Sequence, residues 1–128
     1  MSKLIEGGCA CGRTRYKGAA ADAAPFRCYC RDCQRATGGG HSEMLPLTKD
    51  SFEVTGTLKE YQLVGGSGKP TWSGFCPDCG SPLMRRSARM SDRVYVHAAS
   101  LDDPEHYAAG KELYAEAAQV WAPPKMTD

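Results

Sequence analysis

Seven cysteines in three tight groups constrain this chain more than any other feature of its sequence. The groups are Cys9 and Cys11; Cys28, Cys30 and Cys33; and Cys76 and Cys79. Cysteines that only fill a core are scattered singly along strands, whereas these spacings are those of metal ligands. The count is odd and the N-terminal residues lack the apolar run of an export signal, so a disulfide framework is a poor alternative. We therefore predict metal thiolates in a cytoplasmic chain, because the cytosol keeps thiols reduced.

Four of the cysteines can close one metal shell. Cys9 and Cys11 lie on a glycine-rich turn, and Cys76 and Cys79 flank a turn followed by Gly80, which tolerates a left-handed backbone. Neither pair completes a tetrahedron alone, but together they supply the four thiolates of a structural zinc site. Such an ion would tie the N-terminal segment to the middle of the chain and contribute to the free energy of folding.

The other three cysteines come from one continuous segment and leave a fourth position vacant. Three protein ligands and one exchangeable position are typical of a zinc ion that takes part in chemistry. Three thiolates leave a local charge of −1 on Zn²⁺, which makes the ion a weak Lewis acid but well suited to holding an incoming thiolate. We therefore expect a thiol substrate. The alternative is a second structural site, closed by one of three side chains: His41, His97 or Asp32.

Turn residues recur about every eight to twelve positions, which favours many short strands. We expect strands at residues 13–17, 42–47, 58–64, 71–75 and 93–98. Residues 31–37 predict a short helix that stops at the glycines from Gly38 onward. The alanine-rich residues 111–121 have apolar side chains at helical spacing, so their composition predicts a helix. In 128 residues, 41% apolar and 24% charged content is ordinary for a soluble domain, and the net charge of +1 gives no sign of a polyanionic or membrane partner.

Several motifs occur in an order that resembles the glutathione-dependent formaldehyde-activating (GFA) family, which includes centromere-protein-V-like domains. They are GGCACGRTRY from Gly7, CYCRDCQRATGG from Cys28, FCPDCGSPL from Phe75, SLDDP from Ser100, and the late Trp121. The resemblance implies a single domain over residues 1–128, mainly β, with an Mss4-like fold of several small coiled antiparallel sheets and a short helix, organised around zinc. In that family the segment before the late Trp is extended, so the resemblance favours a strand over residues 113–120.

The resemblance also implies an enzyme, a zinc-dependent carbon–sulfur lyase. Glutathione would bind through its sulfur at the zinc of Cys28, Cys30 and Cys33 and add to formaldehyde or a related carbonyl, giving S-hydroxymethylglutathione. The implied cofactors are two Zn²⁺, with glutathione as a substrate, and the partners are a small thiol and an aldehyde, with no nucleic acid and no membrane. Glutathione carries two carboxylates, and the basic residues nearest in sequence are Arg31 and Arg35.

Two departures from the family pattern leave the substrate open. Tyr29 stands where many relatives carry His, and the glycine run 38–40 is longer than usual. His41 is then a candidate proton carrier. A non-enzymatic zinc module for protein or nucleic acid is the alternative function, based on four arginines: Arg85, Arg86, Arg89 and Arg93. Near-neutral charge and the lack of aromatic residues among those arginines argue against nucleic acid. Metal-free thiol redox chemistry is disfavoured because the Cys-x-x-Cys does not fall at the strand-to-helix junction of a βαβ pattern.

Overall fold

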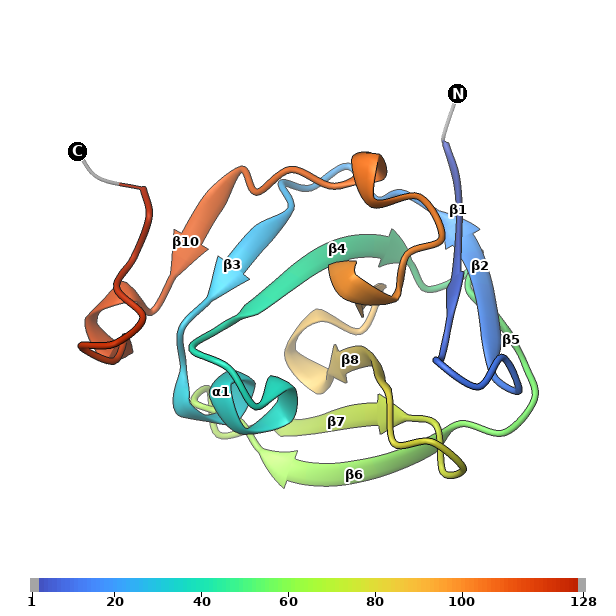
Figure 1. Cartoon of the computed structure of the whole chain (residues 1–128), viewed down its shortest axis with the longest axis horizontal. Helices are drawn as coiled ribbons and strands as arrows, with labels where there is room; N and C mark the ends of the chain where they lie inside the picture. The colour runs from blue at the N-terminus through green and yellow to red at the C-terminus, as the bar shows by residue number, and fades with distance from the viewer. Residues whose placement is uncertain (1–2, 127–128) are drawn as a thin grey trace.

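The computed structural model describes residues 3–126, and their strands form two sheets (Figure 1). The smaller sheet has the order β1-β2-β5 and is antiparallel throughout, with strands Leu4–Gly8, Arg15–Ala19 and Glu53–Thr55. It lies at one end of the molecule, and the C-terminal segment lies at the other. No helix among the described residues has the length and apolar composition needed to cross a membrane.

The larger sheet contains seven strands in the order β10-β3-β4-β9-β8-β7-β6. In that order they are Lys111–Leu113, Phe26–Cys28, Ser42–Thr48, Arg93–His97, Pro82–Ser87, Pro70–Phe75 and Lys59–Val64. Only the β10–β3 pair is parallel. The α-helix α1 spans Arg31–Thr37, and short 3₁₀ turns occupy Ala88–Met90, Ala98–Ser100, Pro104–His106 and Ala115–Ala117.

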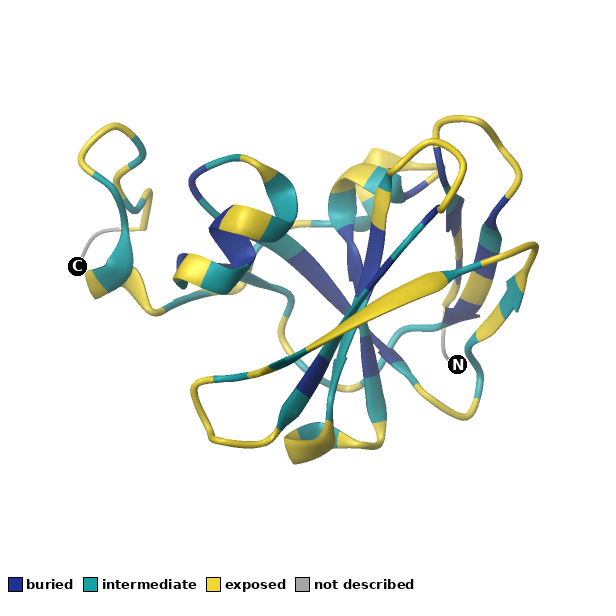
Figure 2. Ribbon diagram, turned by 90° about the horizontal axis from the view of Figure 1, so that it is seen from below, coloured by how far each residue is buried: buried dark blue, intermediate teal, exposed yellow. Residues whose placement is uncertain are grey.

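Strand alternation divides the larger sheet into two faces. Leu45 and Leu47 of β4 pair with Val96 and Val94 of β9, and all four are buried in the apolar core that also contains Ile5 of β1. Buried residues concentrate in the central strands (Figure 2). Each such aliphatic side chain contributes about 1.5–3 kcal/mol to stability. The intervening residues of β4 and β9 point to the opposite face of the sheet, toward α1.

The mainly β fold with one short helix confirms the fold class expected from the sequence. The predicted helix coincides with α1, which ends at Gly38 in the left-handed conformation with φ of 76°. Four predicted strands coincide with β4, β6, β7 and β9 to within one residue at each end, and β2 begins two residues later than predicted. Five strands were not predicted from the sequence: β1, β3, β5, β8 and β10.

The C-terminal segment differs from both sequence-based expectations. Neither a helix over residues 111–121 nor a strand over residues 113–120 forms, and only Lys111–Leu113 is extended, as β10. Tyr114 adopts a left-handed conformation with φ of 56°, which ends the strand. The carbonyl of Ala117 accepts a hydrogen bond from Gln34 of α1. Tertiary contacts of this kind therefore override the helical propensity of the alanines.

Candidate metal centres and their cavity

The first cysteine cluster joins two distant turns. Cys9 and Cys11 follow β1, Cys76 and Cys79 follow β7, and their four sulfurs all lie within 4.8 Å of one another. The Sγ atoms of Cys9 and Cys11 are 3.5 Å apart, and those of Cys11 and Cys76 are 3.8 Å apart. With Zn–S bonds of about 2.3 Å, the edge of a tetrahedral site is about 3.8 Å. The four-cysteine cluster therefore fits a tetrahedral metal ion.

Tight turns and neutral donors hold this cluster in place. Gly80 has a φ of 78°, and its N–H donates to the carbonyl of Cys76 at 2.8 Å, which closes the Cys-x-x-Cys turn. A side chain is strained in that conformation, so glycine is required there. The backbone N–H of Thr14 donates to Cys9 Sγ at 3.3 Å. These contacts orient the sulfurs and leave no open position, as in structural metal sites.

The second cluster lies at the junction of β3 and α1. Cys28 ends β3, Cys30 is the N-cap of α1, and Cys33 lies in its first turn, with the three sulfurs within 4.8 Å of one another. The N–H of Cys33 donates to Cys30 Sγ at 3.3 Å. Hydrogen bonds from Cys28 and then Cys33 lower the pKa of Cys30 to about 2, and the contact with Cys30 raises the pKa of Cys28. The N–H of Cys33 and the neighbouring sulfurs thus favour the thiolate form of Cys30, which is the form that binds a metal ion.

None of the three candidate fourth ligands joins this cluster. His41 Nε2 is 2.7 Å from the carboxylate of Glu43 and belongs to a different network, described below. His97 lies outside the group, and a carboxylate oxygen of Asp32 is 3.8 Å from the guanidinium of Arg85. Among residues 3–126, no other His, Cys, Asp or Glu brings a ligand atom into the group. The three-cysteine cluster therefore keeps an open position.

Arg85 is a site residue that the sequence analysis missed. It donates to Cys33 Sγ at 3.4 Å, pairs with Asp32, and its side chain is only 11% exposed. The sequence analysis grouped Arg85 with three other arginines as possible contacts for a protein or nucleic acid. Its neighbour Arg86 stacks on Trp72, with the guanidinium 3.9 Å from the ring centroid. Both arginines line the cavity described below, but Arg86 pairs with Glu60, whereas Arg85 contacts Asp32 and Cys33. No local pattern in the sequence indicates these partners.

A cavity of about 430 Å³ opens beside the three-cysteine cluster, and all three cysteines line it. Its cationic lining residues are Arg31, Arg85, Arg86, Arg89, Arg93 and Lys111, and Asp32 is its single acidic one. Apolar side chains complete the wall, including Phe26, Met44, Pro46 and Tyr95. Of the two arginines expected to contact glutathione, Arg31 lines this cavity, whereas Arg35 lines a different one. The first cavity suits an anionic ligand that carries a thiol.

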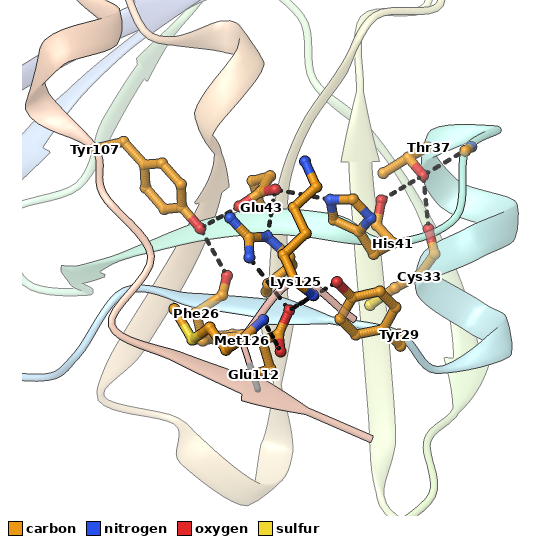
Figure 3. A network of polar contacts seen from close by, with 12 residues as sticks. Phe26, Tyr29, Cys33, Thr37, His41, Glu43, Tyr107, Glu112, Lys125 and Met126 are labelled. Atoms are coloured by element: carbon orange, nitrogen blue, oxygen red, sulfur yellow. Dashed lines mark hydrogen bonds and ion pairs between the residues drawn. The ribbon is translucent and has the colours of Figure 1, made fainter. Parts of the chain in front are cut away.

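A network of polar residues fixes the segment that holds Cys28 and Cys30 (Figure 3). Arg27 donates to Glu43 at 2.7 Å and to Glu112 at 3.2 Å, and the hydroxyl of the fully buried Tyr29 donates to Glu112 at 2.7 Å. Glu43 also contacts His41 and accepts from Tyr107. His41 does not line the cavity beside the cysteines, so the structure does not place it as a proton carrier there.

Glu112 also holds the C-terminal segment. Its two carboxylate oxygens accept from the backbone N–H groups of Lys125 and Met126, each at 3.0 Å. Burial alone would raise the pKa of Glu112, but the N–H of Lys125, the Tyr29 hydroxyl, the N–H of Met126 and Arg27 together lower it to about 2. One carboxylate thus ties the end of the chain to the cysteine-bearing segment.

Glu112→Gln is expected to lower stability at neutral pH and to flatten its dependence on pH. A carboxyl whose pKa is lower in the folded state than its ordinary 4.5 stabilises fully above that value and loses the contribution as pH falls toward 2. Urea unfolding at several pH values measures this, with the exposed Glu116→Gln as the control. If the free energy of unfolding depends on pH in the same way in Glu112→Gln and the wild type, the Glu112 carboxylate does not stabilise the fold as inferred.

The fold and its clusters define a mainly β protein with two cysteine centres able to bind metal ions, one closed and one open to a basic cavity. The chain belongs to the GFA family: the family model "Glutathione-dependent formaldehyde-activating enzyme" matches residues 4–117, which include all seven cysteines.

One relative agrees with this assignment, and one solved structure shares the fold. A Halomonas elongata protein, provisionally named a glutathione-dependent formaldehyde-activating enzyme, is 34% identical over 104 residues, or 77% of this chain and 66% of that protein. The match thus spans slightly less than two thirds of the relative's length. A crystal structure of a Rhodobacter sphaeroides protein superposes with a TM-score of 0.65 at 21% identity, covering 84% of this chain and 98% of that one. At that identity, the second comparison concerns the fold alone.

Proposed function

We propose that this protein is a zinc-dependent carbon–sulfur lyase that joins glutathione to formaldehyde or a related carbonyl compound, and catalyses the reverse cleavage. In the forward direction a C–S bond forms as the S–H bond and the C=O π bond break, and the thiol proton ends on the hydroxyl of the adduct, so no oxidant or reductant is needed. The observation that carries the proposal is the opening of a three-cysteine cluster onto a basic cavity. The family and the name of the Halomonas relative support it.

Sulfur ligands favour zinc in both clusters, with Cys9, Cys11, Cys76 and Cys79 around a structural ion and Cys28, Cys30 and Cys33 around the second. At the second cluster the ion, when bound, supplies a cationic centre that holds an incoming thiol as its thiolate. Arg85 offsets the negative charge that accumulates when a fourth sulfur joins three thiolates. Its guanidinium is held by Asp32 and aimed at Cys33, so the protein compensates charge where the substrate sulfur would lie.

Unpaired cations at the cavity wall suit the carboxylates of glutathione. Arg89, Arg93 and Lys111 line the cavity, and among the described residues none of them has an acidic partner. Arg31 lines it too and donates to Gln34. The arginines after the second Cys-x-x-Cys therefore surround a concave site, which favours a small anion over the extended backbone of a nucleic acid.

Metal content and a thiol titration test the proposal. We expect two zinc ions per chain, and, in protein substituted with cobalt, glutathione should change the thiolate-to-metal absorption of one ion. S-methylglutathione has the same carboxylates and no free thiol, so it should leave the spectrum unchanged. Two ions that both ignore glutathione would instead indicate a zinc-binding interaction module.

Arg85→Gln is expected to weaken glutathione binding about tenfold, which corresponds to about 1.4 kcal/mol. The expected size reflects the loss of one hydrogen bond between charged groups in a largely buried position. The cobalt titration measures it. Arg86→Gln is the matched control, because Arg86 also lines the cavity but pairs with Glu60 and Trp72 instead of a cysteine. Equal losses in the two variants would contradict a specific role for Arg85.

A further inference from the structure

A second cavity, of about 290 Å³, adjoins the first at Asp32, which lines both. Its walls come from α1, β6, β7, the Cys-x-x-Cys turn, the start of β8 and the end of β9. The lining residues with apolar surface are Ala36, Tyr61, Leu63, Gly74, Phe75, Gly80 and Pro82, and the polar ones are Asp32, Arg35, Ser73 and His97. The cysteine clusters account for no part of this space, since none of the seven cysteines lines it.

His97 is the feature that points to a ligand. It is only 5% exposed and lines the cavity, yet within residues 3–126 its ring nitrogens have no hydrogen-bond partner. The ring nitrogens of His97 are not among the fully enclosed unpaired atoms, so they keep surface that a ligand in the cavity can reach. Burial, helped by the charge of Arg85, lowers the pKa of His97 to about 4. The ring is therefore neutral at physiological pH and offers one N–H donor.

The rest of the wall limits what the ligand can be. Leu63, Phe75 and Pro82 present apolar surface, and Asp32 is already paired with Arg85. His97 lies beside these apolar walls, with Arg35 and Ser73 as further polar groups at the same cavity, and this lining matches a ligand with an accepting oxygen and a hydrocarbon part. Formaldehyde has no hydrocarbon part and would occupy little of this volume.

We propose that the second cavity binds a small neutral carbonyl compound with an apolar substituent, whose oxygen accepts a hydrogen bond from His97. Its identification as the carbonyl substrate rests on the proposed function. The thiol would occupy the first cavity and the carbonyl the second, and the two meet at Asp32, beside Cys33. The reaction would then favour longer aliphatic or aromatic aldehydes over formaldehyde.

Binding is tested without any thiol. Cyclohexanone, a ketone that does not readily modify lysines, is titrated into the zinc-loaded protein while the imidazole ¹H–¹⁵N signals are followed. The chain has three histidines, so His41 and His106 are internal controls. We expect a saturable shift at His97 alone, and its loss in Ala36→Phe, where a phenyl ring fills the cavity from α1. No shift at His97, equal shifts at all three histidines, or an unchanged response in Ala36→Phe would overturn the inference.

Kinetics then test the ligand's role. His97→Phe keeps a ring and removes the donor, and is expected to raise KM for hexanal at least fivefold while the glutathione affinity measured with cobalt stays unchanged. An unchanged KM for hexanal would overturn the carbonyl assignment. If the wild type binds cyclohexanone at His97 but turns over no aldehyde with glutathione, the proposed lyase function fails while the binding site stands.

Discussion

Replacing Cys79 with serine is expected to leave the chain without a cooperative thermal unfolding transition. Cys79 is exposed, so the substitution removes no packing and acts only through the lost metal ligand. Structural zinc contributes an apparent free energy of about 10–16 kcal/mol in small zinc-binding peptides, and whole domains are stable by only about 5–15 kcal/mol. Because this cluster joins the turn after β1 to the turn after β7, its loss should separate the two sheets.

Circular dichroism during heating and a zinc count measure the effect. Asp78→Asn is the matched control, since Asp78 is an exposed neighbour and its ion pair with Arg13 lies at the surface. We expect that variant to melt close to the wild type and to keep two ions. A Cys79→Ser protein that melts like the wild type would show that the four-cysteine cluster does not hold the fold together.

Cys30→Ser is expected to abolish glutathione binding and turnover while leaving the fold intact. Cys30 is the N-cap of α1, and its sulfur accepts from the N–H of Cys33. Serine is a preferred N-cap, so the variant keeps the helix start and loses only a thiolate. With Cys28 and Cys33 alone, the second cluster has two ligands and should no longer retain its ion. We expect a loss of activity of at least a thousandfold.

The contrast with Cys79→Ser makes the prediction specific. Cys30→Ser should hold one zinc ion, melt within a few degrees of the wild type, and show no cobalt response to glutathione. If Cys30→Ser keeps full turnover, the three-cysteine cluster takes no part in the reaction. If Cys30→Ser unfolds instead, both clusters are needed to hold the fold together.

Much of the fold followed from local patterns. The helix at Arg31–Thr37 was predictable because its glycine stop and its length are encoded within a few residues. The strand RVYVH was predictable for the same reason, since β-branched residues alternate there. Strands β3 and β10 were missed because each has only three residues and exists through its pairing with a neighbour. The prediction for residues 111–121 was wrong because the left-handed backbone of Tyr114 and the hydrogen bond from Gln34 to Ala117 override the helical propensity of this segment.

The sequence by itself determined which cysteines could group, because ligand spacing is a local property of turns and of the start of a helix. It also indicated that the cysteines divide into a group of four and a group of three, since seven ligands cannot fill two tetrahedral metal sites. Only the tertiary structure decided what surrounds the open cluster. Arg85 reaches Cys33 across 52 positions, and His97 faces a cavity built from five separate elements and a turn. Such neighbours depend on strand order and register, which no local pattern specifies.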